Sequence, residues 1–278
     1  MIDSKADAMN RWTSRPSVPD SGRITTMNQT QPQNESPVAT AVVIGRAGSK
    51  GLPRKHVRLV DGVPMIARSV GHALAARRVG RVLCSTDGEA IASVAAAVGA
   101  EVLVRPAALA SDHATVDAGV RHAIEASGDD AEVIVILYGS IPIRPDGLID
   151  RAVARLIDTG ADSVQSYSPV GKHHPYWTCR LDDDGRIAAW QDNDVFRRQD
   201  LPPAFIPDGG VIAVRRASLF RVDPEHPHAF LGTDRRGVLN ELGTVIDVDD
   251  EIDLLVAEAI LERRRRADDA SVRAGAEA

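Results

Sequence analysis

Short apolar runs rich in Val and Ile alternate along the chain with longer stretches whose apolar residues recur every three or four positions. The short runs predict β-strands, because β-branched side chains favour extended backbone. They lie at 42–44, 82–85, 101–104, 132–137 and 163–167. The run at 132–137 is apolar on both faces, which is typical of a strand with helices on each side.

The longer stretches predict helices, because their apolar residues share one helical face. They lie at 64–76, 89–98, 112–126 and 146–158, with Asp112 or Thr115 as the cap of the third. Strands and helices therefore alternate at the spacing of βαβ units. We expect an α/β fold in three layers, with a mostly parallel sheet and right-handed crossovers.

The pattern changes at 169–203, where a turn sequence at 181–186 separates two short strand-like runs. The runs at 177–181 and 187–191 predict a hairpin. We therefore expect a small β-rich insertion at 169–203 that serves as a dimerisation arm.

After this insertion the core pattern returns. Strands are expected at 210–214 and 245–248, followed by an amphipathic helix at 251–266. Four apolar residues are expected on the buried face of that helix: Ile252, Leu255, Ile260 and Leu261.

The two ends of the chain differ from this core. Residues 1–37 are rich in Ser, Thr, Asn, Gln and Pro and lack aliphatic periodicity. Such a segment buries too little apolar surface to offset the entropy of ordering, so a disordered tail is expected, and it has no apolar centre of the kind a secretory signal needs. The folded domain should span 38–266, followed by a flexible tail at 267–278.

Composition narrows the class of protein. The chain of 278 residues is 44% hydrophobic and carries a formal net charge of -6, which argues against a general nucleic-acid binder. Cys84 and Cys179 are its only cysteines, which fits a reducing, cytoplasmic location. No apolar run approaches the roughly 18 residues that span a membrane.

A glycine-rich loop follows the first strand. Gly45, Gly48 and Gly51 alternate with Arg46, Ser49 and Lys50. Small residues let backbone N–H groups approach an anion, and the cations add charge, so the pattern predicts a phosphate-binding loop. The spacing fits neither a P-loop, which needs Gly-Lys-Ser/Thr, nor the dinucleotide fingerprint G-x-G-x-x-G.

The sequence Arg-Ala-Gly-Ser-Lys-Gly-Leu-Pro-Arg-Lys at 46–55 resembles the R-G-G-S-K-G-I-P-x-K loop of acylneuraminate cytidylyltransferases, the CMP-sialic acid synthetases, which are related to CMP-Kdo synthetases. Five further segments resemble family motifs in the same order, at 85–87, 105–112, 197–203, 207–210 and 246–258. The resemblance covers about 39–262. It implies a Rossmann-like nucleotidyltransferase domain that transfers CMP from CTP to an acidic sugar, with Mg²⁺ as cofactor, and a homodimer.

The resemblance also implies roles for individual residues. Catalytic roles fall to Arg46, Lys50 and Arg198. Nucleotide-binding roles fall to Gly48, Ser49, Gly51, Asp87, Tyr138 and Ser140. Sugar-binding roles fall to Arg105, Gln199, Asp208 and Gly209. Asp247 and Asp249, two apart at the end of an expected strand, are the implied metal ligands.

Three residues depart from the family pattern. His56 stands where Asn is usual, Tyr138 replaces a Gln, and Asp208 replaces an Asn beside the sugar. We expect the choice of base to lie with Tyr138 and the choice of sugar with Asp208, because each changes the hydrogen bonds or charge offered to substrate. CMP-Kdo synthesis, another nucleotide donor, and a non-catalytic nucleotide-sugar-binding protein are the alternatives.

Overall fold

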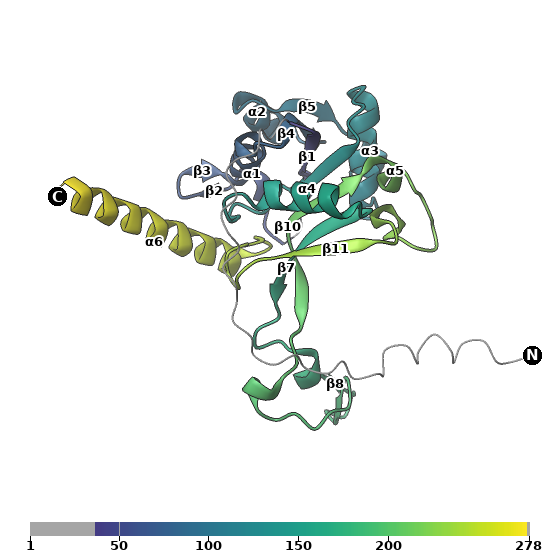
Figure 1. The fold of residues 1–278 in the computed structure, drawn as a ribbon, viewed down its shortest axis with the longest axis vertical. Helices are drawn as coiled ribbons and strands as arrows, with labels where there is room; N and C mark the ends of the chain where they lie inside the picture. The colour runs from purple at the N-terminus through teal and green to yellow at the C-terminus, as the bar shows by residue number, and fades with distance from the viewer. Residues whose placement is uncertain (1–36, 50, 277–278) are drawn as a thin grey trace, which may run out of the picture. The chain divides into compact units, whose positions relative to one another are not determined.

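A seven-stranded sheet runs through the part of the chain that the computed structural model describes, residues 37–49 and 51–276 (Figure 1). Its strands in chain order are β1 (Ala39–Ile44), β4 (Val79–Thr86), β5 (Glu101–Val104), β6 (Val133–Tyr138), β7 (Ser163–Pro169), β10 (Phe205–Arg215) and β11 (Arg235–Leu239). They lie side by side in the order β11-β7-β10-β6-β1-β4-β5. All pairs are parallel except those of β10, which is antiparallel to β6 and β7.

Helices cover both faces of the sheet, which confirms the three-layer α/β fold. One face packs against α1 (Met65–Ala75), α2 (Glu89–Ala97) and α4 (Leu148–Thr159). The other packs against α3 (Val116–Ala126), the short α5 (Arg216–Leu219) and the 3₁₀ turn η6 (Ala229–Leu231). The five strands expected at the start of the chain are all present, so apolar periodicity identified the core correctly.

Strand β1 shows why the chain forms these layers. On β1, Ala41 and Val43 join the cluster under α1 and α2, while Val42 and Ile44 join the cluster under α3. Successive side chains of a strand point to opposite faces, so a run that is apolar at every position fills two cores at once.

A third apolar cluster lies beside the glycine loop. It brings Leu52 and Val248 together with Leu254 and Ala257 at the start of α6 (Glu251–Ala276). The small hairpin of β2 (Leu59–Val60) and β3 (Val63–Pro64) adds Val60 to the same cluster. The start of α6 is therefore attached to the loop that was predicted to bind phosphate.

The predicted insertion forms a separate hairpin, β8 (Cys179–Leu181) paired with β9 (Ile187–Ala189). It leaves the sheet where β7 ends and returns where β10 begins, since Phe205 pairs with Pro169 (Figure 1). The hairpin prediction is confirmed. Every residue of β8 and β9 is exposed, so the described chain alone offers this arm no core of its own.

Four expectations about local structure were wrong. Residues 245–248 form no strand, only a bridge between Ile246 and Ile143, and β11 occupies the sheet edge instead. β11 begins Arg-Arg-Gly, so it lacks the apolar pattern that a buried strand shows. Helix α3 begins at Val116, not at 112, with Thr115, one of the two expected caps, at its N-cap position.

The other two wrong expectations concern the last helix, α6. Ile252 and Leu255 are exposed, and Leu254 and Ala257 are buried in their place. Ile260 and Leu261, the other two expected residues, are half-buried against the third cluster, so the pattern identified only part of the buried face. It also continues to Ala276, past the expected helix end at 266; the flexibility expected of 267–278 stays a prediction. The tail expected at 1–37 lies, except for Pro37, outside the described residues.

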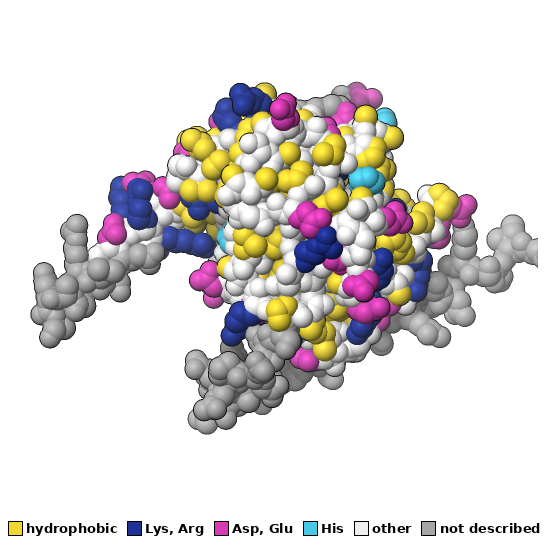
Figure 2. Space-filling model, turned by 90° about the horizontal axis from the view of Figure 1, so that it is seen from above, with side chains coloured by type: hydrophobic (Ala, Val, Ile, Leu, Met, Phe, Trp, Pro, Cys, Tyr) yellow, Lys and Arg dark blue, Asp and Glu magenta, His cyan; other side chains and the backbone are white. Residues whose placement is uncertain are grey.

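Charges are interspersed on the face seen in Figure 2. Lys and Arg side chains stand among Asp, Glu and apolar side chains, with no continuous basic surface on this face of the described residues. Among the described helices, none is long and apolar enough to span a membrane.

Candidate active site

The carboxyl ends of three parallel strands meet at one edge of the sheet. The glycine loop follows β1, Asp87 follows β4, and Gly139 follows β6. Strand pairing continues into these loops: Gly45 N–H donates to the Ser85 carbonyl at 3.2 Å, and Gly139 N–H donates to the Ile44 carbonyl at 2.8 Å. Ligands of open α/β sheets collect at such an edge.

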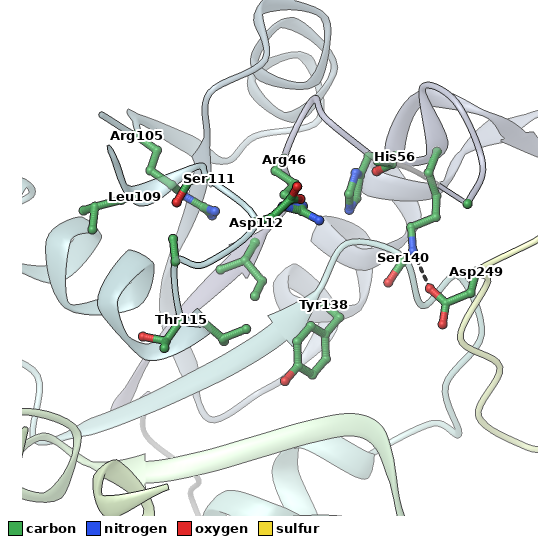
Figure 3. Close-up of a pocket in the computed structure, with 17 residues that line it drawn as sticks. Arg46, His56, Arg105, Leu109, Ser111, Asp112, Thr115, Tyr138, Ser140 and Asp249 are labelled. Carbon is green, nitrogen blue, oxygen red and sulfur yellow. Dashed lines mark hydrogen bonds and ion pairs between the residues drawn. The ribbon is translucent and has the colours of Figure 1, made fainter. Parts of the chain in front are cut away.

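A cavity of about 550 Å³ opens at this edge (Figure 3). Its lining comes from the glycine loop, the segment between β5 and α3, the end of β6 and the segment before α6. Its polar lining residues are Arg46, Ser49, Lys55, His56, Arg105, Ser111, Asp112, Thr115, Tyr138, Ser140 and Asp249. Arg46, Ser49, Gly51, Tyr138 and Ser140 were all predicted to bind nucleotide or phosphate, so the structure brings these residues together.

Two carboxylates hold the glycine loop in place. Asp87 accepts a hydrogen bond from the Ala47 N–H at 2.9 Å, and Arg46 forms an ion pair with Asp112 at 2.7 Å. Asp87 thus holds the loop backbone and is not among the residues lining the cavity. Gly48 is exposed beside the cavity, and Lys50 lies outside the described residues.

The second half of the loop is fixed to the segment before α6. Lys55 Nζ donates to Asp249 at 2.7 Å, and Arg58 pairs with Glu251. A Cβ on Gly51 would lie 2.6 Å from the Asp249 carbonyl oxygen, so only glycine fits there. Lys55 was not among the site residues predicted from the sequence, although it is the Lys of the Pro-x-Lys pattern that ends the loop.

His56 is buried in the wall of the cavity. Its ring fills the space left by two glycines, since a Cβ on Gly45 or Gly139 would lie 3.1 or 3.0 Å from it. Burial, with the neighbouring charge of Lys55, lowers the His56 pKa from 6.5 to about 4, so the ring is neutral near pH 7. Its Nδ1 is buried and has no hydrogen-bond partner in the described chain.

Arg105 belongs to this first cavity and does not lie with the other predicted sugar-binding residues. Its Nε and Nη2 donate to the Ser85 hydroxyl and carbonyl, at 3.1 and 2.8 Å. Burial lowers its pKa, and the charge of Asp87 opposes this shift. Asp208 and Gly209 line a different cavity.

That second cavity, of about 350 Å³, lies on the other side of Tyr138 and contains both Asp208 and Asp247. Asp247 accepts a hydrogen bond from the Ser140 hydroxyl at 2.7 Å. Burial, and secondarily the charge of Asp249, raises the Asp247 pKa. The two predicted metal ligands therefore line different cavities, Asp249 the first and Asp247 the second. No group of three or more His, Cys, Asp or Glu residues suited to a metal occurs in the described chain.

Asp208 is surrounded by hydrogen-bond donors. Its Oδ1 accepts from Ser166 and from the Gly210 N–H, and its Oδ2 accepts from Ser168 and Asn240 at 2.9 and 2.8 Å. A carboxylate has about four acceptor positions, so the protein itself occupies them. The bond network pins the irregular pairing of β10 with β7 between Pro207 and Ile212.

Arg198 and Gln199 do not reach either cavity in the single chain. They begin the exposed 3₁₀ turn η5 (Arg198–Asp200) at the end of the arm segment. Their neighbour Arg197 pairs with Asp200 at 2.6 Å.

Arg144 was not predicted as a site residue, yet it joins the backbone beside Tyr138 to the backbone of Gly210. It is almost fully buried and donates to the carbonyls of Gly210, Ile141 and Tyr138. Burial lowers its pKa to about 9, opposed by the charges of Asp247 and Asp208. The sequence offered only an Arg after a strand, with no sign that its donors would be used internally.

The first cavity combines the side chains that a polyphosphate requires. Three cationic residues, Arg46, Lys55 and Arg105, converge on it from separate elements, beside a glycine loop whose backbone approaches closely. Multiple charge-assisted hydrogen bonds of this kind stabilise an anion carrying several negative charges.

Comparison with known proteins agrees with this geometry. A sequence profile described as "Cytidylyltransferase" matches residues 40–206. The chain is 26% identical over 227 residues to "Post-translational flagellin modification protein B" of Campylobacter coli, which covers 80% of this chain and 94% of that protein. It is 28% identical over 237 residues to "CMP-N,N'-diacetyllegionaminic acid synthase" of Legionella pneumophila, covering 82% and 97%.

A third relative is longer. The chain is 28% identical over 182 residues to "N-acylneuraminate cytidylyltransferase" of Streptococcus agalactiae serotype V, covering 65% of this chain and less than half, 44%, of that protein. Among solved structures, CMP:2-keto-3-deoxy-manno-octonic acid synthetase in complex with CTP has the same fold, with a TM-score of 0.63 at 16% identity over 81% of this chain and 99% of that one. A profile match over more than half of the sequence, on the residues that build the cavity, shows that this chain belongs to the cytidylyltransferase family.

Proposed function

We propose that this protein transfers the CMP group from CTP to a hydroxyl of an acidic sugar, with release of pyrophosphate. The observation that carries the proposal is the convergence of Arg46, Lys55 and Arg105 on the glycine-loop cavity, next to further cavities across Tyr138. Relatives named for N-acylneuraminate and for N,N'-diacetyllegionaminic acid support an acidic sugar as acceptor.

The residues of the chain act mainly by position and charge. Arg46, Lys55 and the loop N–H groups hold the triphosphate, and Lys50 is proposed to join them. The sugar oxygen then attacks the α-phosphorus, the bond to the β-phosphate breaks, and the hydroxyl proton is released. Fixing the two reactants and neutralising the leaving pyrophosphate accounts for most of the catalysis expected in phosphoryl and nucleotidyl transfer.

Asp247 and Asp249 are the residues proposed to hold Mg²⁺. Because the two carboxylates line different cavities, the ion is proposed to bind at the boundary between them, with substrate phosphates and water as its other ligands; Mg²⁺ commonly binds only one or two carboxylates. The raised pKa of Asp247, caused by burial and then by Asp249, indicates negative charge that a cation would offset. Bound Mg²⁺ would neutralise charge on the phosphates.

The arm is proposed to form a homodimer. Seven large apolar side chains stand exposed on or beside it: Trp177, Leu181, Ile187, Trp190, Phe196, Phe205 and Ile206. Exposed apolar surface of this kind marks an interaction site. A partner would also give Arg198 and Gln199 a cavity to face. Light scattering should give twice the 29.7 kDa chain mass, and Ile187→Asp should reduce it to one chain. A monomeric wild-type protein would refute the dimer.

A cytoplasmic location is proposed on the cysteines alone. Cys84 is buried and Cys179 exposed, and both are free thiols. Free thiols persist in reducing compartments.

Pyrophosphate release tests the function. Purified protein is incubated with Mg²⁺, each of the four NTPs, and a panel of N-acylneuraminic, N,N'-diacetyllegionaminic and 2-keto-3-deoxy-manno-octonic acids. Release with CTP and one acid, absent without the acid, is the expected result. Release with another nucleotide would reassign the donor, and preference for the octonic acid would favour the CMP-Kdo alternative. Binding without release from any pair would favour a non-catalytic binding protein.

A further inference from the structure

Tyr138 stands where three cavities meet. It lines the glycine-loop cavity, the second cavity with Asp208 and Asp247, and a third cavity of about 410 Å³ between β7, β10 and η6. The third cavity is walled mainly by apolar and aromatic side chains, including Tyr167 and Phe230. Its volume lies within the range of about 300–1,000 Å³ seen for small-molecule sites.

Charge distinguishes the second cavity from the third. The second contains the carboxylates of Asp208 and Asp247, and no Lys or Arg among its described lining residues. The third contains Arg235, at the start of β11, and one carboxylate, Asp117, which is already paired with Arg121 at 2.5 Å. An acidic sugar is repelled by the two carboxylates of the second cavity and attracted by Arg235 in the third cavity.

Backbone carbonyls orient the Arg235 guanidinium and leave its Nη1 hydrogens available to a ligand. Its Nε donates to the Gly232 carbonyl at 2.8 Å, and its Nη2 donates to the His228 carbonyl at 2.9 Å. Within the described chain its Nη1 makes no hydrogen bond. A guanidinium fixed on one side and open on the other is suited to bind a carboxylate.

The Tyr138 hydroxyl is also unpaired within the described chain. The ring points away from Arg46 and Arg105, so the hydroxyl is on the side of the cavity opposite to these cations (Figure 3). Burial, and then the charge of Asp247, raises the Tyr138 pKa, which keeps the phenol protonated and able to donate.

We propose that the third cavity binds the acceptor, with Arg235 holding its carboxylate and the Tyr138 hydroxyl donating to it at the boundary with the triphosphate. This rests on the proposed function. It also revises the expectation from sequence that Tyr138 chooses the base: the residue selects the acceptor. Neither Arg235 nor this cavity stood out in the sequence, because an Arg-Arg pair on an edge strand resembles a solvated surface.

Two variants and a matched control test the proposal. Arg235→Met removes the carboxylate partner and Tyr138→Phe removes only the hydroxyl. Arg236→Met is the control, because Arg236 follows Arg235 on β11, points to the opposite face and pairs with Asp234 at 2.6 Å. Arg235→Met should raise the KM for the acidic sugar by about 10- to 100-fold and Tyr138→Phe by roughly 5- to 10-fold, as loss of charged and neutral hydrogen bonds predicts. CTP affinity, measured by calorimetry without sugar, should stay within about twofold in all three.

The acceptors are the three acids of the panel, each with its methyl ester as a neutral match. Wild type should prefer acid over ester, and Arg235→Met should lose that preference while Arg236→Met keeps it. An unchanged preference in Arg235→Met, or an equal loss in the control, would overturn the proposal. Acid binding is also followed by calorimetry with CTP present. A wild type that binds an acid without turnover would refute the proposed function but still test the cavity, and a wild type that binds none of the acids would refute the cavity as well.

Discussion

The carboxylate of Asp208 offers the sharpest prediction about this fold. The family motif that residues 207–210 resemble has Asn at this position, so Asp208→Asn matches the motif and removes one negative charge. In this chain, however, the surroundings match a carboxylate: Ser166 and Gly210 donate to one oxygen, and Ser168 and Asn240 to the other. An amide nitrogen placed at either oxygen would meet two donors.

The loss of stability in Asp208→Asn depends on which of these donor groups can rotate and accept a hydrogen bond instead. A serine hydroxyl can rotate to accept from the new amide. The Gly210 N–H cannot, and Asn240 is held because its Oδ1 accepts from Arg151 at 3.2 Å. At least one hydrogen bond to a charged acceptor is lost and one donor–donor contact is created. With about 1.5–3 kcal/mol for such a bond and a further desolvation cost, we expect a loss of roughly 2–4 kcal/mol in the free energy of unfolding.

Thermal unfolding of Asp208→Asn measures this directly. For a domain of this size 1 kcal/mol shifts Tm by about 2–4 °C, so Tm should fall by roughly 5–15 °C. Asp200→Asn, an exposed carboxylate paired with Arg197, is the control and should change stability by less than about 1 kcal/mol. A variant as stable as wild type but with an altered KM for the sugar would refute the reasoning and assign Asp208 to substrate.

The remaining predictions concern the glycine loop, the buried His56 and the half-buried His72 on α1. Lys50→Ala should cut turnover by about 100-fold, as loss of a transition-state charge contact does; near-normal rates would remove Lys50 from the mechanism. Lys55→Met should weaken CTP binding by about 10- to 100-fold in calorimetry, while its exposed neighbour Arg54→Met should not; equal effects would point to general electrostatics. Burial lowers the pKa of His56 from 6.5 to about 4 and that of His72 to about 3. The unfolded chain therefore binds more protons below pH 6.5, so stability is full above pH 6.5 and falls as the pH drops toward 4. Urea unfolding at pH 7.5, 6 and 5 measures the fall, and His72→Gln should reduce the slope; a flat profile in wild type would contradict it.

Local patterns predicted the layers of the fold well. The β1 and β6 runs are apolar at nearly every position, which requires cover on both faces, and the structure has it. The same reasoning failed at 245–248 and at β11, because edge strands and loop segments bury few side chains and carry little pattern. For α6, Ile252 and Leu255 looked like core residues, yet the helix contacts its neighbours elsewhere on its surface.

The glycine loop could be predicted as an anion site from its sequence, because glycines and cations are interleaved directly after a strand. Sequence also determined that the loop would sit at the carboxyl edge of a parallel sheet. Only the tertiary structure decided which side chains line each cavity at this edge of the sheet. It placed Arg105 with the loop, used the acceptor positions of Asp208 internally, and set Tyr138 between a cavity lined by two carboxylates and two cavities that also contain arginine. Such outcomes depend on distances between segments far apart in the chain, and a side chain's partner cannot be assigned until those segments have been packed.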